Sequence, residues 1–315
     1  MKAIVQRKFG SPDVLELREI EKPVPGEDQV LLKIAAVSLN AYDWRHVRAD
    51  PFLLRLMGGG LLKPKHPVLG ADMAGTVEAV GKNVTRFQPG DEVFGEGHYG
   101  GLAEYACADQ HCFVLKPANL SFEAAAAAPM AALTALQGLR NTGKIREKQK
   151  VLINGASGGV GTFAVQIAKS FGAEVTGVCS TSKVDLVRSL GADHVIDYTL
   201  EDITRLGERY DLIFDTAAYR SISDYKRILN PGGMYVLAGG SISRIMQLMF
   251  KTSRNKNMRL ISAKVIREDL QTISELLETG KIKSAIDKSY PLTETAAAMR
   301  YLEQGHVRGK VVITV

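Results

Sequence analysis

The stretch Val151-Leu-Ile-Asn-Gly-Ala-Ser-Gly-Gly-Val-Gly161 decides the fold, because an apolar, β-prone segment runs through it into a glycine-rich turn. The segment that follows places Phe163, Val165 and Ile167 between polar positions, as in an amphipathic helix. A second strand-like segment, Glu174–Cys179, comes next. The whole run of about 30 residues predicts one β-α-β unit of a dinucleotide-binding domain.

Two glycines of this turn have distinct physical roles in the prediction. Gly158 lets the backbone come close to a pyrophosphate, and Gly161 lets the helix pack closely on the strand. The first amides of the helix and its dipole then hold the anion. The first position of the G-x-G-x-x-G pattern is Ala156, with Gly155 just before it, and the β-α-β context offsets this departure. The alternative is a glycine-rich turn that binds no nucleotide.

The end of the second strand indicates which nicotinamide nucleotide binds. An NAD site usually carries Asp or Glu there, which holds the ribose hydroxyls. This chain has Cys179-Ser-Thr-Ser-Lys183, with Ser180 at the acidic position and no carboxylate before Asp185. Hydroxyls and a lysine suit a 2′-phosphate, so the sequence predicts NADPH. The alternative is that Lys183 is a solvated residue at the start of a helix.

Composition places the chain among ordinary globular enzymes. A length of 315 residues is enough for two domains. The chain is 45% hydrophobic and 23% charged, which are ordinary globular values, and its net charge is +6. The basic residues are spread along the chain, so no nucleic-acid partner is expected. No secretory signal and no spanning apolar segment are evident. The few cysteines (Cys107, Cys112 and Cys179) indicate a reducing compartment, and the predicted location is the cytoplasm.

The sequence pattern changes twice, which predicts one domain inserted in another. The first third is β-rich, strands and helices alternate from Val151 onward, and the alternation loosens after about Ser284. We therefore expect an α/β fold with a doubly wound, parallel Rossmann sheet in residues 123–284. This domain is inserted in a β-rich catalytic domain of residues 1–122 plus 285–315, and the cleft between the two is expected to hold the substrate.

The individual elements follow from apolar alternation, helical spacing and turn residues. Besides the β-α-β unit, the predicted strands are Lys2–Arg7, Leu15–Ile20, Gln29–Leu39, Gly75–Val80, Glu92–Phe94, Leu102–Ala106, Phe113–Leu115, Asp193–Ile196, Asp211–Asp215, Gly233–Leu237, Arg259–Ala263 and Lys310–Val315. The predicted helices are an Ala-rich one capped by Ser121 and interrupted by Pro129, then Val184–Leu190, Ser221–Leu229, Asp269–Thr279 and Thr293–Glu303.

Landmarks spread over nearly the whole chain carry a family resemblance. They are Met1–Val5, Pro25-Gly26 with the strand after it, Ser38-Leu-Asn40 with Asp43, Pro67–Gly75, Gly81, Phe87–Phe94, Gly101–Tyr105, Leu133–Ala135, Leu190–Tyr198 and Gly309–Val312. With the glycine-rich turn, they resemble the medium-chain dehydrogenase/reductase superfamily, and within it the zinc-free quinone oxidoreductase branch that includes zeta-crystallin. The resemblance implies that the β-rich domain is GroES-like and that the protein is a homodimer.

No metal site is expected. In zinc-dependent members of the superfamily a cysteine follows the third strand and a Gly-His-Glu triplet follows the Pro-x-x-x-Gly segment. Here those positions read Asn40 and Gly70-Ala71-Asp72, so two of the three zinc anchors are missing. The four-cysteine zinc lobe is missing as well. Cys107 and Cys112 are interpreted as small hydrophobic residues on the two arms of a strand–turn–strand.

Without zinc, no Lewis acid lowers the pKa of an alcohol, so reduction of a conjugated carbonyl or quinone is the favoured chemistry. Charge then develops on the substrate oxygen, and one or two hydrogen-bond donors stabilise it. The candidate catalytic residues are Asn40 and Tyr42, with Asp43 orienting them. The alternatives are that Asn40 only makes a turn after a strand, and that Tyr42 and Asp43 belong to the start and cap of a helix.

The resemblance also implies the cofactor contacts. It places Thr134 near the nicotinamide, and Ala238, Gly239 and Gly240 along the nicotinamide where a side chain would clash. The other implied contacts are Ser157, Gly158, Gly159 and Val160 with the pyrophosphate, Ser180 and Lys183 with the 2′-phosphate, and Tyr198 with the adenosine. Lys264 and Arg308 are possible phosphate or carbonyl contacts, and the alternative is that both are plain surface cations.

Two segments suggest further roles. The apolar segment 51–62 contains three consecutive glycines and is interpreted either as a flap over the substrate, lined by Met57 and Leu61, or as a helix and turn packed on the core. The segment 242–256 combines an apolar face with several basic residues. It is interpreted either as a cover of the cleft or dimer contact, or as a surface that touches an anionic membrane.

The sequence thus leads to one principal hypothesis and two alternatives. The principal hypothesis is a zinc-independent, NADPH-dependent oxidoreductase that reduces small hydrophobic quinones or α,β-unsaturated carbonyls by hydride transfer. The first alternative is an NADPH-dependent reductase of C=O bonds. The second is a non-catalytic NADPH-binding protein with a regulatory or structural role.

Overall fold

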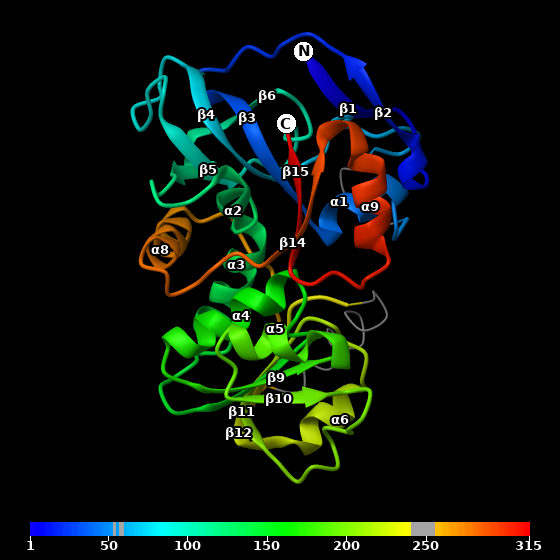
Figure 1. The fold of residues 1–315 in the computed structure, drawn as a ribbon, viewed down its shortest axis with the longest axis vertical. Helices are drawn as coiled ribbons and strands as arrows, with labels where there is room; N and C mark the ends of the chain where they lie inside the picture. The colour runs from blue at the N-terminus through cyan, green and yellow to red at the C-terminus, as the bar shows by residue number, and fades with distance from the viewer. Residues whose placement is uncertain (53–54, 57–59, 241–255) are drawn as a thin grey trace. The chain divides into compact units, whose positions relative to one another are not determined.

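The computed structural model describes residues 1–52, 55–56, 60–240 and 256–315. The chain forms two compact units, which Figure 1 shows as a ribbon. The first unit comprises Met1–Met130, Val265–Thr279 and Ser284–Val315, and the second comprises Ala131–Lys264 and Gly280–Lys283. These bounds differ from the predicted division at 122/123 and 284/285, because residues 123–130 and 265–279 pack on the β-rich unit.

The second unit is built on a six-stranded parallel sheet with the strand order β10-β9-β8-β11-β12-β13. The first strand of this sheet in the chain, β8, lies at its centre. Strands β9 and β10 are added on one side of β8 and the later strands on the other, so the predicted Rossmann sheet is confirmed. Its strands are β8 (Lys150–Asn154), β9 (Glu174–Cys179), β10 (His194–Asp197), β11 (Tyr210–Asp215), β12 (Leu229–Leu237) and β13 (Met258–Leu260).

The apolar run 151–153 forms the central strand because it is buried on both faces of the sheet. Helix α4 (Gly159–Ser170) packs on β8 and β9, α5 (Val184–Ser189) on β9 and β10, and α6 (Ile222–Arg227) on β12 (Figure 1). Helix α3 (Pro129–Gln137) continues into a π-helical turn, η4 (Gly138–Thr142), and a short 3₁₀ turn, η5 (Thr181–Lys183), precedes α5.

The first unit is a mostly antiparallel sheet with the order β14-β15-β3-β4-β5-β7, in which β6 also pairs with β3. A separate pair, β1 (Lys2–Gln6) and β2 (Leu15–Glu19), lies beside it. The other strands are β3 (Gln29–Leu39), β4 (Asp72–Val80), β5 (Glu92–Glu96), β6 (Tyr105–Asp109), β7 (Phe113–Leu115), β14 (Ile286–Pro291) and β15 (Lys310–Thr314).

Within the part of this unit that the structure describes, four helices accompany the sheet. They are α1 (Ala41–Arg48), α2 (Phe122–Ala126), α8 (Arg267–Glu278) and α9 (Thr295–Glu303). Helix α1 begins directly where β3 ends, and α9 packs against it. Short 3₁₀ turns complete the unit: η1 (Pro12–Val14), η3 (Gln110–Cys112) and η6 (Leu292–Glu294).

Most elements lie where the sequence predicts them, and β3 and β7 have the predicted bounds. Three differ. Pro129 begins α3 instead of only interrupting the preceding helix, because a proline at the first helical position lacks only an N–H that would be unpaired anyway. The strand expected at 102–106 lies at 105–109. Strand β14 is not predicted, because it is an edge strand whose side chains lack a fully buried apolar face.

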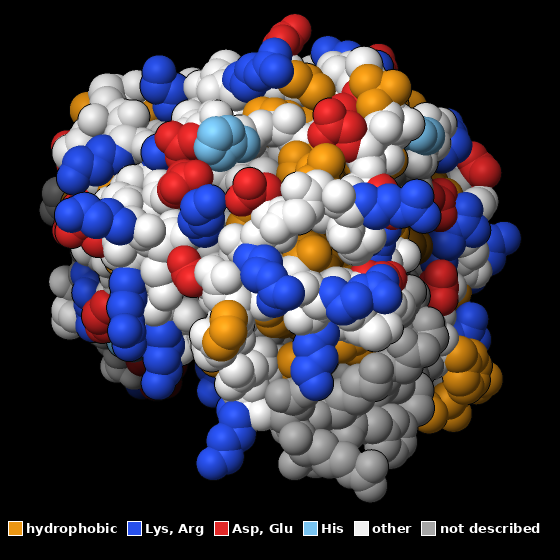
Figure 2. Space-filling view, turned by 90° about the horizontal axis from the view of Figure 1, so that it is seen from below, with side chains coloured by type: hydrophobic (Ala, Val, Ile, Leu, Met, Phe, Trp, Pro, Cys, Tyr) orange, Lys and Arg blue, Asp and Glu red, His pale blue; other side chains and the backbone are white. Residues whose placement is uncertain are grey.

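Of the two segments with suggested further roles, 51–62 lies partly and 242–256 almost wholly outside the described residues. The structure does not describe 53–54 and 57–59, which include Met57, or 241–255 of the basic segment; Leu61 is exposed. None of the described helices is long and apolar enough to cross a membrane. On the face drawn in Figure 2, the described Lys and Arg side chains are interspersed with Asp and Glu and form no continuous basic band.

We expect Gly75→Ala to destabilise the first unit. A Cβ added at Gly75 in β4 would lie 2.2 Å from the carbonyl oxygen of Lys33 in the neighbouring strand β3, so the two strands would have to separate. Forced overpacking of this kind costs about 1–3 kcal/mol. Urea unfolding measures the effect, and Thr76→Ala on the same strand is the matched control. Equal unfolding midpoints for the two variants would contradict the prediction.

Candidate functional site

The glycine-rich turn has the shape of an anion cradle. Gly155 has a φ of +78°, which side chains rarely adopt, and a Cβ at Gly161 would lie 2.0 Å from the Gly155 carbonyl oxygen. Both positions therefore require glycine, and Gly161 brings the start of α4 against the end of β8. Among the described residues, no side chain caps the N-terminus of this 12-residue helix. Its first amides and dipole are available to a bound anion.

Gly158 differs from Gly161 in what surrounds it. It is the residue before the first turn of α4, and a Cβ placed there would meet only the Gly155 carbonyl oxygen, at 3.5 Å. Glycine is therefore not needed here for packing within the unit. The open space beside its backbone fits the close approach of a phosphate. This contrast supports the predicted role of Ser157, Gly158, Gly159 and Val160 toward a pyrophosphate.

The turn after β9 carries the residues proposed for the 2′-phosphate. Ser180 precedes η5, and Ser180 and Lys183 are both half-buried. The Thr181 and Thr199 hydroxyls lie 2.9 Å apart, so this turn is linked to the end of β10. There the Asp197 carboxylate accepts hydrogen bonds from the Thr199 backbone amide at 2.9 Å and from its hydroxyl at 2.7 Å.

Asp197 is a carboxylate near this turn that sequence spacing does not reveal. Strands β9 and β10 pair with Cys179 opposite Asp197, which places Asp197 beside Ser180 although it lies 17 residues further along the chain. A hydrogen bond from Thr181, followed by those from Thr199, holds the pKa of Asp197 below its usual range. The surrounding hydroxyls therefore keep this carboxylate ionised and engaged with the protein.

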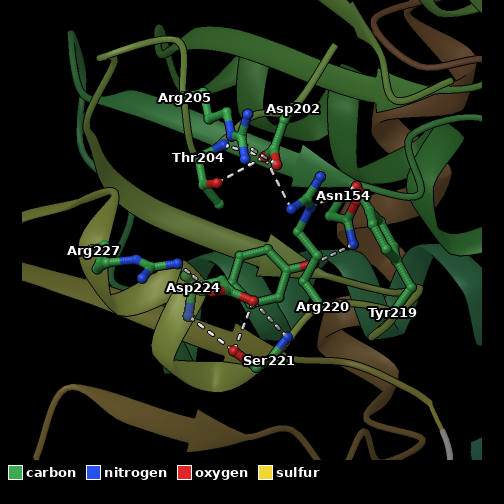
Figure 3. A network of polar contacts seen from close by, with 10 residues as sticks. Asn154, Asp202, Thr204, Arg205, Tyr219, Arg220, Ser221, Asp224 and Arg227 are labelled. Atoms are coloured by element: carbon green, nitrogen blue, oxygen red, sulfur yellow. Dashed lines mark hydrogen bonds and ion pairs between the residues drawn. The ribbon is translucent and has the colours of Figure 1, made fainter. Parts of the chain in front are cut away.

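An exposed aromatic pair adjoins the same end of the sheet. Tyr198 follows β10, and its ring lies 5.6 Å from the ring of Tyr219, with both side chains more than 40% exposed. Figure 3 shows the neighbouring Arg220 reaching the Asp202 carboxylate, at 2.9 Å. Figure 3 also shows the cap of α6, where the Ser221 hydroxyl and Asp224 bond each other. An exposed aromatic face of this kind suits the adenosine.

The remaining cofactor candidates divide between the two units. Ala238, Gly239 and Gly240 follow β12, and the Ala238 amide donates to the Asp215 carbonyl at 2.8 Å. Gly240 has a φ of +118°, and a Cβ at Gly239 would lie 3.2 Å from the Thr216 carbonyl. The glycine turn, Ser180, Lys183, Tyr198 and residues 238–240 therefore meet at the carboxyl edge of one parallel sheet. Thr134 lies on α3 of that unit, whereas Arg308 belongs to the first unit, where its amide donates to Asp287.

The first unit places the candidate catalytic residues at the start of α1. Asp43 is fully buried, and its carboxylate accepts hydrogen bonds from the Asn40 amide at 2.8 Å and the Gly70 amide at 3.2 Å. Asp43 thus caps the helix in the way that the alternative interpretation proposes. It also ties the start of α1 to the loop before β4.

The Asn40 side chain is fixed on both sides by protein groups. Its Nδ2 donates to the Asp72 carboxylate at 2.9 Å and to the Ser38 carbonyl at 3.3 Å. Its Oδ1 accepts a hydrogen bond from the Lys310 ammonium. Both ends of the amide are therefore engaged, and in this conformation Asn40 links Lys310 to Asp72.

The sheet register explains this arrangement. Val311 lies opposite Leu39, Ser38 lies opposite Asp72, and Asp72 lies opposite Glu96. The residues therefore form one polar row across four neighbouring strands: Lys310 on β15, Asn40 at the end of β3, Asp72 on β4 and Glu96 on β5. We call these four residues together with Asp43 the polar row.

The polar row is an unusually buried set of charges. The Lys310 ammonium lies 3.6 Å from the Asp72 carboxylate, and their side chains are 3% and 0% exposed. Asp72 also accepts a hydrogen bond from the Met130 amide at 2.9 Å. Sequence reasoning misses Lys310, Asp72 and Glu96 as site residues. The available signal is charged residues at the ends of otherwise apolar strands, above all Lys310 before Val-Val-Ile.

Burial shifts the titration of every ionisable member of the polar row. It raises the pKa of Asp43 to about 7 and that of Glu96 to about 8, and it raises the pKa of Asp72. It lowers the pKa of Lys310, although the nearby carboxylates oppose this. Each shift disfavours the charged form because a low-dielectric interior solvates ions poorly.

Tyr42 lies beside the polar row with a phenol that stays protonated. Burial raises its pKa well above the usual value, and the hydrogen bond with Tyr99 and the charges of Asp43 and Glu96 act in the same direction. The Tyr42 ring lies 4.0 Å from the His46 ring and 6.0 Å from the Tyr99 ring. Tyr42 is therefore a hydrogen-bond donor at neutral pH, as its candidate role requires.

The described residues contain no group of three or more His, Cys, Asp or Glu side chains that could hold a metal ion. Burial raises the pKa values of the Cys107 and Cys112 thiols to about 11, so both are neutral thiols at physiological pH. Neutral thiols are poor metal ligands.

Comparisons with known proteins agree with this architecture. The family models described as "Alcohol dehydrogenase GroES-like domain" and "Zinc-binding dehydrogenase" match residues 26–118 and 190–313. The chain is 36% identical to a 2-methylene-furan-3-one reductase of Solanum lycopersicum and 36% identical to an NADPH-dependent alkenal/one oxidoreductase of Arabidopsis thaliana. Each alignment covers 99% of this chain and 79% of the relative. The solved quinone oxidoreductase of Coxiella burnetii superposes with a TM-score of 0.88 at 30% identity, covering 100% of this chain and 99% of the other.

We expect Gly158→Ala and Gly161→Ala to have different effects. Gly161→Ala should lower the melting temperature, because its Cβ has no space against Gly155. Gly158→Ala should fold normally but bind a dinucleotide about 10-fold more weakly, because its Cβ fills the space left for a phosphate. Thermal melting and fluorescence titration measure the two effects. A Gly158→Ala variant with unchanged dinucleotide affinity would contradict the assigned cradle.

The polar row also predicts a pH dependence of stability. The pKa of Glu96 is about 8 in the folded protein and near 4.3 in the unfolded chain, so the folded state binds the proton more tightly. The resulting stabilisation is complete below about pH 4 and is lost as the pH rises through about 8. Relative to Glu96→Gln, the wild-type free energy of unfolding should therefore decrease over that range. Glu92→Gln on the same strand, whose side chain is exposed, is the control and should show no such decrease.

Proposed function

Because the chain belongs to the medium-chain dehydrogenase/reductase superfamily, among its quinone-oxidoreductase-like members, we propose that it is an NADPH-dependent reductase of quinones or α,β-unsaturated carbonyls. The observation that carries this proposal is the uncapped first turn of α4 with its glycine cradle. The Ser180–Lys183 turn supports NADPH over NADH, because Ser180 stands where an NAD site usually has an acidic residue. The alkenal/one and quinone chemistry named for the similar proteins supports the substrate class.

The residues present fit NADPH. The cradle of Gly155, Gly158 and Gly161 leaves room for a pyrophosphate, Ser180 and Lys183 suit the 2′-phosphate, and Tyr198 and Tyr219 offer aromatic faces to the adenosine. When bound, NADPH supplies the hydride. The contributions of Thr134, of residues 238–240 and of Arg308 to its binding are part of this proposal.

The chain's own residues supply positioning and hydrogen bonding. Tyr42 keeps its proton and can donate it in a hydrogen bond to an oxygen on which negative charge develops. Asp43 fixes the first turn of α1, which carries Tyr42, through two backbone amides. Asn40 is held by Lys310 and Asp72, so in this conformation its role is to position the site rather than to donate to substrate.

We propose that the reaction needs no zinc, although one matching family model is described as a zinc-binding dehydrogenase. Asn40 and Ala71 stand where the zinc-dependent members have a cysteine and a histidine. The Lys310 ammonium contacts the Asn40 amide oxygen, so a positive charge already occupies this position. A metal ion beside an ammonium would meet like-charge repulsion in a buried site.

We also propose that the protein is a homodimer of the cytoplasm. Both parts follow from the family resemblance and the low cysteine content. Light scattering and cell fractionation test them separately from the activity.

The decisive experiment compares NADPH and NADH oxidation by the chelator-treated protein with a quinone, an enone and a simple ketone. We expect turnover of the quinone or the enone, preference for NADPH, and no loss of activity on chelation. Chromatography of the enone product separates a saturated ketone, expected for C=C reduction, from an allylic alcohol, expected for C=O reduction. Tight NADPH binding with no turnover of any substrate would contradict the enzymatic proposal and favour a regulatory or structural role.

We expect Lys183→Ala to discriminate between the two nucleotides. Loss of a charge-assisted contact with the 2′-phosphate should raise the Kd for NADPH about 10- to 100-fold and leave the Kd for NADH unchanged. Lys226→Ala, which removes an exposed lysine of the same unit, is the control. Equal effects of Lys183→Ala on the two nucleotides would show that Lys183 does not contact the phosphate.

A further inference from the structure

The polar row contains more acids than it can keep ionised. Asp43, Asp72 and Glu96 face a single buried cation, Lys310, so full ionisation would leave a net charge of −2 in a largely buried space. Asp72 and Glu96 are also direct partners on neighbouring antiparallel strands. Like charges so close in a low dielectric cannot all persist, and one carboxyl takes up a proton.

Hydrogen bonding identifies which carboxyl carries this proton. Asp43 accepts from two backbone amides, and Asp72 accepts from the Met130 amide and the Asn40 side chain and lies beside Lys310. Donors of this kind stabilise a carboxylate. Glu96, whose side chain is only 13% exposed, receives no hydrogen bond to its carboxyl from any residue that the structure describes. Its neutral form is therefore the favoured one.

Glu96 is the most exposed ionisable member of the polar row, with 13% of its side chain exposed against 3% for Lys310 and 0% for Asp72. The imidazole Nδ1 of His98 lies 3.9 Å from its carboxyl, and the His98 side chain is 58% exposed. His98 has a φ of +68°, so the chain turns sharply at the end of β5 to place it there. Protons can therefore be exchanged at Glu96 without passing through the buried members of the polar row.

We propose that Glu96 holds the proton that the reduction consumes and recovers it from solvent beside His98. This inference rests on the proposed function, because hydride addition leaves a reduced substrate that must also gain one proton. The O–H bond of the Glu96 carboxyl breaks, its electron pair stays on the carboxylate, and the proton passes to the reduced substrate. A solvent proton then restores the carboxyl. Glu96 is thus a proton-holding residue that acts through neighbouring groups and water.

The charged and titratable groups around Glu96 act on its proton in both directions. Asp43 and Tyr42 on α1, Asp72 on β4 and Lys310 on β15 surround Glu96, and Cys112 on η3 and His98 complete the set. Burial is the main cause of the raised pKa of Glu96, the charges of Asp72 and Asp43 add to it, and Lys310 opposes it. The proton is therefore held at neutral pH but remains exchangeable.

The first test uses the protein without cofactor or substrate. Carbon-13 NMR of glutamate carboxyls should show one signal that titrates near pH 8, in agreement with the raised pKa. That signal should be absent from Glu96→Gln and present in Glu92→Gln, the exposed control on the same strand. If every glutamate carboxyl of the wild type titrates in the acidic range, the proposal is overturned, whatever the activity of the enzyme.

The second test measures turnover against pH. For the wild type, kcat should fall as the pH rises through about 8, because Glu96 is then deprotonated. Glu96→Gln should lower kcat about 10- to 100-fold with KM unchanged and abolish that pH dependence, and Glu96→Asp should partly restore both. A Glu96→Gln variant with the wild-type pH profile refutes the role. Failure of the wild type to reduce any substrate refutes the proposed function instead, and the NMR titration still decides the protonation of Glu96.

Discussion

The buried contact of the Lys310 ammonium with Asn40 and Asp72 ties distant segments of the first unit together. It joins the last strand to the end of β3 and the start of α1, across 270 residues of chain. Because all three groups are buried, removing one would leave the others uncompensated, at a cost of about 3–5 kcal/mol for a buried ion pair.

The second unit achieves its site in a different way. Parallel strands bring the ends of β8, β9, β10 and β12 to one edge, and the loops that follow carry the glycine cradle, the Ser180–Lys183 turn, Tyr198 and residues 238–240. Among the described residues, this edge offers the first amides of α4 and the Ser180 and Thr181 hydroxyls, which suit phosphate binding. The glycine cradle of one unit thus relies on backbone amides, whereas the polar row of the other relies on buried charged side chains.

The two sites were not equally predictable. The glycine turn could be found in the sequence because only glycine fits at two of its positions. Gly161 is packed too closely for a side chain, and Gly155 has a positive φ that other residues rarely adopt. Asn40, Tyr42 and Asp43 could be found as neighbours in the chain, but the sequence could not show that the Asn40 amide is engaged on both sides. The position of Asp197 beside Ser180 was also hidden, because it depends on how β9 pairs with β10.

Local sequence was sufficient to predict the alternation of strands and helices, the glycine cradle, and the absence of a cysteine and a histidine at Asn40 and Ala71. Each of these depends on local stereochemistry or on the identity of a side chain. Only the tertiary structure brought Lys310, Asn40, Asp72 and Glu96 into one row. That row follows from the register of four strands, Val311 with Leu39, Ser38 with Asp72 and Asp72 with Glu96. Register is set by the packing of the whole sheet, and no short segment encodes it.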